Sequence, residues 1–428
     1  MLGRLVVKSR KRTAVQLLVK NARILDREDL VSVWCEGGLI AGISGSGDEP
    51  ASAERELDLN GNVLLPAFVN AHLHPDKSLL GDQLGRPGWD LDEAVKFTWE
   101  FKANGTVDEI AERSTRAVLE CLANGSTVVR AFADVDNVGG LTPIKGLLEM
   151  RERLRELVDV EVVSFPQEGL LRPEGDIGLI REGLELGADI VGGLPWFERS
   201  DEDARKHVDL IMDLAQEFDV DVHMLADDTD DPTSRSLEYL AIQTIERGWQ
   251  GRVSASHCGA LASYEHTHAA KVIDLIREAE MTICSNPQIS LVLDGLRDKG
   301  LIRRGITRTQ ELLDAGVNVM AAQDDIDDPY YPFGRGDQLE VASFVAHVVR
   351  LTDPEGIRSC IDMVTTNAAK ALRLDWYGLE VGKRADLVVL EGKHLREAIR
   401  LQRPRPYVIR EGRVVVETTV EQTVEQPS

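Results

Sequence analysis

The middle of the chain contains eight short runs of hydrophobic and β-branched residues, and each run ends in polar side chains. They cover residues 64–72, 126–135, 159–168, 188–195, 219–225, 253–258, 281–287 and 317–325. Amphipathic stretches with helical spacing separate most of these runs, for example at residues 141–158 and 309–316. Apolar strands that alternate with helices are typical of a parallel sheet covered on both faces. Eight such units predict an α/β fold of the (β/α)8 TIM-barrel type.

A doubly wound open sheet is the alternative arrangement. It would favour a glycine-rich phosphate-binding turn after the first strand. The first run here continues into HLHPDK, at residues 72–77, so the barrel is favoured.

The two ends of the chain have a different pattern, with short strands punctuated by turn residues. These strands fall within residues 16–65, 385–392 and 405–417. Each end is too short to form a stable domain alone, so we expect both ends to pair into one small β-sandwich. The expected division is residues 1–65 and 377–428 for the sandwich and residues 66–376 for the barrel.

Composition limits the partners and the compartment. The 428 residues are 43% hydrophobic and 29% charged, with a formal net charge of −24. This acidity argues against a nucleic-acid partner or an anionic membrane surface. The five cysteines form no CxxC pair, and neither a secretory leader nor a membrane-spanning stretch is recognisable. We expect a soluble, cytoplasmic, homo-oligomeric protein without disulfides.

Histidines and acids gather at the ends of the predicted barrel strands. His72 and His74 end the first run, His223 the fifth and His257 the sixth, and Asp324 and Asp325 end the eighth. A His-x-His pair alone is often only the polar face of a strand. Functional side chains in a barrel lie at the carboxyl ends of the strands, so the other residues indicate a shared site.

These residue types suit one divalent metal ion, Zn²⁺ or Fe²⁺, with one position left for water. Such a site activates water for hydrolytic attack on an sp² carbon, and His257 and Asp324 are placed to move protons. The fourth run ends in VGGLPWFE, residues 191–198, without a lysine that could be carbamylated to bridge two metals. A mononuclear site is therefore predicted.

Other histidines have ordinary interpretations. We expect His207 on an exposed helix face and His347 packed within a helix, while His394 lies in a surface loop.

The order His72-x-His74, His223, His257 and Asp324 resembles the amidohydrolase superfamily in its mononuclear, deaminase-type branch. From about residue 16 to the end, the chain is similar to bacterial cytosine deaminases. The segments that carry this similarity are FPQEGLL, LGADIVGGLPWFE, VSASHC, RRGIT, DDIDDPYYPFG and GLEVGKRADLVVL.

The resemblance implies a role for each matching residue. The metal ligands would be His72, His74, His223 and Asp324, and His257 would lie over the water and the ring carbonyl. Gln167 would hydrogen bond to an amide-like edge of the substrate, and Asp325 and Tyr330 would complete the substrate site.

The sequence also departs from the cytosine deaminase pattern. Ala226 stands where these enzymes carry the glutamate that shuttles a proton, and Phe132 replaces a histidine on the second strand. Tyr330 replaces a tryptophan. The pair Asp76 and Lys77 after His74 looks more like N-isopropylammelide amidohydrolases, which also lack the glutamate and remove an alkylamine.

Another residue must therefore protonate the leaving amine. Lys77 is the favoured candidate, because desolvation beside a bound cation would lower its pKa. Asp227 is the alternative, since it lies four residues past His223 and would share its face on a continued strand. We interpret Asp228 and the rest of DDTDDP as a solvated loop.

The leading hypothesis is a metal-dependent aminohydrolase acting on a small N-heterocycle. Gln167 favours a cytosine-like pyrimidine or related base, whereas HPDK favours a triazine. Hydrolysis of a cyclic or linear amide is a second enzymatic hypothesis. A non-catalytic binding barrel is the remote alternative, and the complete set of ligand residues argues against it.

Overall fold

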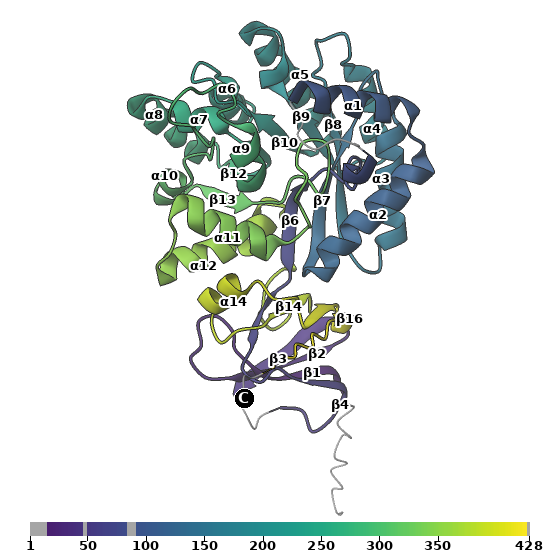
Figure 1. Ribbon diagram of the computed structural model, residues 1–428, viewed down its shortest axis with the longest axis vertical. Helices are drawn as coiled ribbons and strands as arrows, with labels where there is room; N and C mark the ends of the chain where they lie inside the picture. Colours follow the sequence, from purple (N-terminus) through teal and green to yellow (C-terminus); the bar gives the residue numbers. More distant parts are fainter. Residues whose placement is uncertain (1–14, 46–48, 84–90, 426–428) are drawn as a thin grey trace, which may run out of the picture. The chain divides into compact units, whose positions relative to one another are not determined.

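The computed structural model describes residues 15–45, 49–83 and 91–425 (Figure 1). The chain forms two compact units. One comprises Ala67–Asp375, and the other combines the segments that end at Pro66 and begin at Trp376. Of the N-terminal stretch that shows no recognisable secretory leader, residues 1–21, the first 14 lie outside the described residues.

The larger unit contains the predicted barrel. Its eight strands are hydrogen bonded in the order β13-β12-β11-β10-β9-β8-β7-β6, and every pair with a printed register is parallel. The strands are β6 (Phe68–Leu73), β7 (Ser126–Asp134), β8 (Asp159–Phe165), β9 (Ile190–Gly193), β10 (Asp221–Ala226), β11 (Val253–His257), β12 (Thr282–Ser285) and β13 (Asn318–Ala321). Each falls within or overlaps one of the eight predicted runs, which confirms the fold class.

Helices fill the connections between these strands. The α-helices of this unit are α1 (Leu91–Asn104), α2 (Val107–Ala123), α3 (Thr142–Leu154), α4 (Ile177–Glu185), α5 (Asp201–Phe218), α6 (Ser236–Glu246), α7 (Gly259–Ser263), α8 (His266–Glu278), α9 (Pro287–Leu293), α10 (Thr309–Asp314), α11 (Gln338–Val349), α12 (Pro354–Met363) and α13 (Thr366–Ala371). Two short 3₁₀ helices, η1 (Gly81–Gln83) and η2 (Pro195–Phe197), follow β6 and β9. Ser200 shows how a helix begins here, because its side chain caps α5 by accepting from the backbone N–H of Asp203.

The seam between the first and last strands is closed by backbone hydrogen bonds of three predicted metal ligands. The N–H of Asp324 donates to the carbonyl of His72 over 2.9 Å, and the N–H of His74 donates to the carbonyl of Asp324 over 2.9 Å. Leu73 and Asp324 form a parallel bridge at the same point. The ring is therefore closed where the functional residues lie.

The smaller unit is built from both ends of the chain. One sheet has the order β3-β2-β1-β4 and the other β16-β15-β14-β5. Their strands are β1 (Val15–Ala22), β2 (Val31–Glu36), β3 (Leu39–Gly45), β4 (Ala53–Asp58), β5 (Val63–Pro66), β14 (Leu387–Leu390), β15 (Tyr407–Arg410) and β16 (Arg413–Glu417), with α14 (Leu395–Leu401) after β14. One hydrophobic core joins residues from both ends, such as Leu17, Val33, Leu387 and Ile409.

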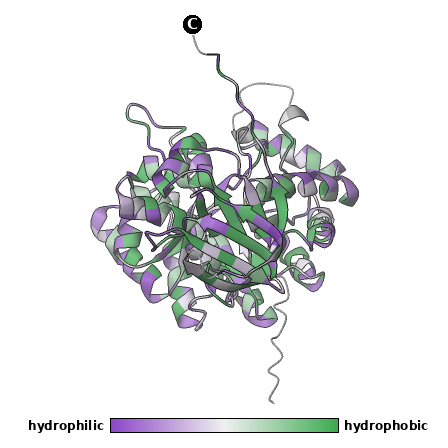
Figure 2. Ribbon diagram, turned by 90° about the horizontal axis from the view of Figure 1, so that it is seen from below, coloured by the Kyte–Doolittle hydropathy of each residue, from purple (hydrophilic) through white to green (hydrophobic). Residues whose placement is uncertain are grey.

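Hydrophobic residues concentrate on the strands, while the helices carry mixed polar and apolar residues (Figure 2). All nine residues of β7 are buried. Among the described residues, no helix combines the length and hydrophobicity that crossing a membrane requires.

Candidate active site at the carboxyl ends of the barrel strands

Three imidazoles and one carboxylate meet where β6, β10 and β13 end. Nε2 of His72 lies 3.2 Å from Nε2 of His74 and 3.1 Å from Oδ1 of Asp324. The same carboxylate oxygen is 3.5 Å from Nε2 of His74. His223 joins from β10, with its Nε2 3.3 Å from Nδ1 of His72. The structure thus brings together all four residues predicted to bind a metal.

This cluster fits a divalent cation. Burial lowers the pKa of His72, His74 and His223 well below the ordinary histidine value, so the rings are held neutral. Neutral imidazole nitrogens and a carboxylate are metal donors, and their close approach is favourable around a positive ion. Nδ1 of His74 also has no hydrogen-bond partner among the described residues, although it is buried.

Phe132 forms the apolar floor beneath these ligands. Its ring stacks on His72 with centroids 4.1 Å apart and meets His223 edge to face at 4.9 Å. At the position where cytosine deaminases carry a histidine, this side chain adds packing and no further donor.

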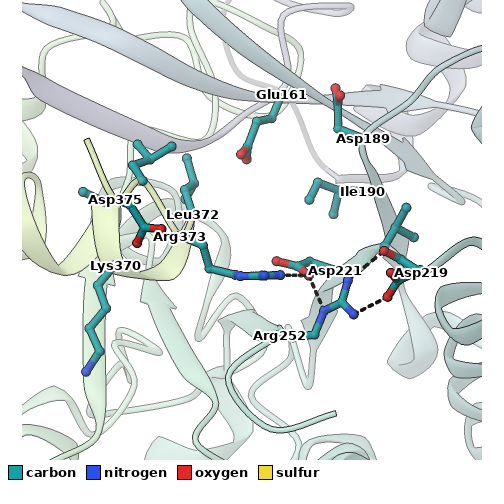
Figure 3. A pocket seen from close by; sticks show the side chains of 13 residues that line it. Glu161, Asp189, Ile190, Asp219, Asp221, Arg252, Lys370, Leu372, Arg373 and Asp375 are labelled. Carbon is teal, nitrogen blue, oxygen red and sulfur yellow. Dashed lines mark hydrogen bonds and ion pairs between the residues drawn. The ribbon is translucent and has the colours of Figure 1, made fainter. Parts of the chain in front are cut away.

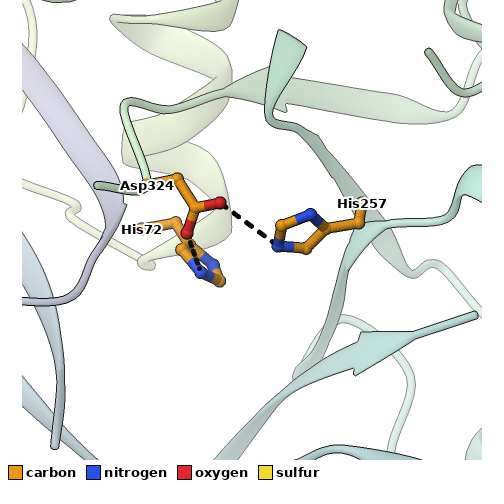
Figure 4. Close-up of side chains that lie close together, drawn as sticks. All are labelled: His72, His257 and Asp324. Carbon is orange, nitrogen blue, oxygen red and sulfur yellow. Dashed lines mark ion pairs between the residues drawn. The ribbon is translucent and has the colours of Figure 1, made fainter. Parts of the chain in front are cut away.

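His257 approaches the cluster from β11 (Figure 4). Its Nε2 lies 3.5 Å from Oδ2 of Asp324, the oxygen that does not face His72. His257 and Asp324 have φ angles of 64° and 71°, in the left-handed region that non-glycine residues rarely adopt. The backbone turns sharply at both strand ends, and such strain is typical of functional sites.

Asp228 is a contact that the sequence interpretation missed. Its Oδ1 lies 3.1 Å from Nδ1 of His257, so this aspartate is not part of a wholly solvated loop as expected. Burial lowers the pKa of His257, but Asp228 and Asp324 outweigh it and raise that pKa to about 9. The arrangement orients the imidazole and favours its protonated form.

Arg130 is a second missed contact. The guanidinium is buried within the barrel, where it pairs with Glu161 of β8 over 2.8 Å and lies 3.3 Å from Nδ1 of His223. Nδ1 of His223 is the ring nitrogen turned toward this arginine, and Nε2 is the one turned toward His72. No sequence motif indicated a role for this arginine, because it lies within a strand whose sequence is otherwise typical of a buried strand.

Lys77 is buried near the site, yet its environment differs from the expectation. Its ammonium group lies 3.2 Å from Oδ1 of Asp134 and donates to Oε1 of Gln167 over 2.8 Å. Burial alone would lower its pKa, but Asp134 and Asp76 outweigh burial and raise it. The predicted lowering of the Lys77 pKa is therefore wrong, because carboxylates surround the amine.

The Asp227 carboxylate is not placed to act as a proton donor. Its carboxylate accepts from the hydroxyls of Ser234, Ser236 and Tyr264 and from the backbone N–H groups of Ser236 and Leu237. The residue adopts a φ of 54°, so the strand does not continue and the shared face with His223 is lost. These bonds assign Asp227 to holding the start of α6.

The three predicted substrate-binding residues lie around the same end of the barrel. Gln167 is half-buried just past β8, and Tyr330 is half-buried with its ring centre 5.6 Å from the Lys77 ammonium. Asp325 is buried and hydrogen bonds to Asp328. Burial, and then Asp324, raise the pKa of Asp325 to about 8.

A separate hollow of about 540 Å³ lies among the amino ends of the middle strands (Figure 3). Four of its charged side chains pair with one another: Arg252 binds Asp219 and Asp221, and Arg373 binds Asp221. This hollow is at the end of the barrel opposite to the histidine cluster. It supplies no reactive group, so the chemistry belongs to the histidine cluster.

Two histidines outside the site differ from expectation. His207 is fully buried, with Nδ1 2.7 Å from Glu198 and Nε2 accepting from the N–H of Leu194. It anchors the segment after β9. His347 is exposed on α11, and its Nδ1 hydrogen bonds to the backbone carbonyl of Ser343.

Residues 91–416 match the model of the amidohydrolase family. The chain belongs to this family. Its members are metal-dependent hydrolases that act on carbon–nitrogen bonds, which confirms both the resemblance and the enzymatic class.

Two relatives span almost the whole chain. N-isopropylammelide isopropyl amidohydrolase of Pseudomonas sp. strain ADP is 30% identical over 94% of this amidohydrolase and 98% of its own length. The crystal structure of 5-methylcytosine deaminase from Klebsiella pneumoniae with 5-fluorocytosine has 33% identity and a TM-score of 0.90. It covers 95% of this chain and 99% of that one. Pterin deaminase of Rhizobium rhizogenes is 26% identical over 88% of this chain and 86% of its own.

Proposed function

We propose that this amidohydrolase is a mononuclear aminohydrolase that deaminates a cytosine-like pyrimidine or a related N-heterocycle. The division of the Asp324 carboxylate carries this proposal. One oxygen faces His72 and His74, while the other faces His257. A carboxylate placed in this way serves a metal ion and a proton-transfer partner together.

The metal would be held by His72, His74, His223 and Asp324, and Zn²⁺ and Fe²⁺ both suit these donors. When bound, it supplies water acidified to near neutral pH. Asp324 accepts the proton of that water through Oδ2. The water oxygen would bond to the ring carbon while the second water proton passes to the adjoining ring nitrogen, and the C–N bond would then break to leave a ring carbonyl and an amine.

The leaving nitrogen needs a proton, because an amide anion is too basic to depart near neutral pH. His257 is the group we assign to this step, since it contacts Asp324 on one side and Asp228 on the other. The proton taken from water can pass from Asp324 through His257 to the amine. This route replaces proton transfer by the glutamate that cytosine deaminases carry at the position of Ala226.

Removal of an alkylamine from a triazine is the second candidate. The segment HPDK and the full-length relative that acts on N-isopropylammelide favour it. Triazine and pyrimidine substrates share alternating ring nitrogens and carbonyls, so the same residues would serve both.

A substrate screen of the metal-loaded protein tests the proposal. Cytosine, 5-methylcytosine, isocytosine, isoguanine, ammelide and N-isopropylammelide are followed by loss of ring absorbance and by release of ammonia or isopropylamine. Turnover of a pyrimidine above the triazines supports the first candidate, and the reverse order supports the second. Failure with every compound would contradict both.

A further inference from the structure

The side-chain amide of Gln167 is held in one orientation by Lys77. The ammonium group donates to Oε1 of Gln167 over 2.8 Å. An ammonium group has three donors and no acceptor, so the amide oxygen must face it. The amide NH₂ therefore points to the other side. Among the described residues, no group accepts from Nε2, and Gln167 is half-buried rather than enclosed.

Both partners in this contact are fixed from behind. Lys77 is buried and lies 3.2 Å from Oδ1 of Asp134, whose backbone N–H donates to Asp76. The residue after Gln167 is tied as well, because Glu168 accepts from Lys102 of α1 over 2.9 Å. Lys102 also reaches Asp136 over 2.5 Å. Two lysines thus immobilise the loop after β8.

Rotating the amide by 180° would be costly. It would place the NH₂ group of Gln167 against the Lys77 ammonium, so two donors would face each other at 2.8 Å and the buried cation would lose an acceptor. An amide in solution samples both orientations, whereas this one keeps a single order of donor and acceptor. Hydrogen bonding to a cation also makes the NH₂ group a stronger donor.

We infer that Lys77 is a positioning residue that makes Gln167 a fixed hydrogen-bond donor, so that the substrate must offer a ring carbonyl as acceptor there. This inference rests on the proposed function for the identity of the substrate. For a pyrimidine whose C4 faces the metal, the acceptor is the C2 carbonyl edge. An analogue with an amino group at C2 presents a donor in place of that carbonyl oxygen and should bind more weakly.

Binding of two probes to variants of Gln167 tests the donor role. Uracil and isocytosine, which carry a C2 carbonyl and a C2 amino group, are titrated calorimetrically into metal-loaded protein. Gln167→Glu keeps an acceptor but loses the N–H, and Gln167→Met loses both. We expect each variant to weaken uracil binding by about 5- to 50-fold. Uracil affinity of Gln167→Glu within about twofold of the wild type would overturn the inference.

A second pair of variants tests the role of Lys77. Lys77→Met frees the amide to rotate, so the ratio of uracil to isocytosine affinity should fall at least about fivefold. Lys77→Arg still donates to Oε1 and should keep the wild-type ratio. A merely structural loss in Lys77→Met would weaken both probes equally. An unchanged ratio in that variant would overturn the inference.

A crystal structure of the unliganded enzyme separates this inference from the proposed function. If neither probe binds because the substrate class is wrong, the orientation of Gln167 can still be examined. A Lys77 to Gln167 separation beyond about 3.5 Å would overturn it. If this contact stays at hydrogen-bond distance and the enzyme turns over none of the pyrimidines or triazines, only the proposed function is rejected.

Discussion

Oδ1 of Asp228 lies 3.1 Å from Nδ1 of His257, which places an acid behind the imidazole that faces Asp324. A carboxylate in this position fixes the ring orientation and stabilises the imidazolium. We expect Asp228→Ala to lower kcat about 100-fold with little change in metal content. Steady-state kinetics and metal analysis check this.

Asp231 provides the matched control in the same loop. It is exposed, and its side chain accepts only from Thr233 among the described residues. Asp231→Ala should keep kcat within about twofold, because this residue touches neither His257 nor its partners. Equal losses in both variants would mean that the loop matters, and not the Asp228 carboxylate.

One metal ion per chain is expected, and His223→Ala should abolish both metal binding and activity by removing a ligand. Chelation should lower the melting temperature by about 5 °C, since a ligand that binds only the folded state stabilises it. Elemental analysis and thermal unfolding measure both. Two tightly bound equivalents, both needed for turnover, would contradict the mononuclear site.

Asp324→Asn separates the two oxygens of this side chain. The amide oxygen can still face His72 and His74, but it cannot accept the proton of water as a carboxylate does. We expect the variant to keep much of its metal and to lose at least about 1000-fold in single-turnover rate. A rate within tenfold of the wild type would remove Asp324 from proton transfer.

Arg130 contacts the His223 ring from inside the barrel. Its replacement should therefore weaken metal binding without removing a metal ligand. Arg130→Lys is expected to weaken metal binding about 10- to 100-fold, measured by competition with a chelator. Arg252→Lys is the control, because Arg252 pairs with Asp219 and Asp221 at the opposite end of the barrel. Metal affinity unchanged in Arg130→Lys would show that His223 is oriented without the arginine.

Asp294 should make the enzyme less stable as pH rises. Burial, and then Asp228, raise its pKa to about 7 from the ordinary 3.8. A group with a raised folded-state pKa contributes stability fully below about pH 4 and loses it as pH rises through 7. Asp294→Asn stays neutral, so its melting temperature should exceed the wild type's at pH 8 and match it near pH 4. An equal difference at both values would contradict the assignment.

The strands and the convergence of the four predicted ligands could be predicted because both depend on local pattern. Each apolar run had the length and composition of a buried strand, and parallel strands place their carboxyl ends at one rim. His72, His74, His223 and Asp324 occupy those ends, so their convergence followed from the fold. The seam between β6 and β13 was not visible, because it depends on backbone hydrogen bonds between distant residues.

The contacts around the ligands could not be predicted in this way. Asp227 and Asp228 are adjacent acids, and a left-handed backbone at Asp227 directs one into a cap and the other toward His257. The spacing from His223 had favoured Asp227, rather than Asp228, as a proton donor. The raised pKa of Lys77 likewise depends on Asp134, which comes from another strand. Such effects appear only when distant elements are placed in space.

The closing of the barrel through His72, His74 and Asp324 has a consequence for how the enzyme comes apart. The residues that we propose as metal ligands also join the two edge strands through their backbone hydrogen bonds. Loss of the metal would therefore weaken the connection between β6 and β13. We expect partial opening of the barrel to start there. Amide hydrogens at β6 and β13 should become the first in the barrel to exchange after chelation, so demetallation and fraying of the ring are one event.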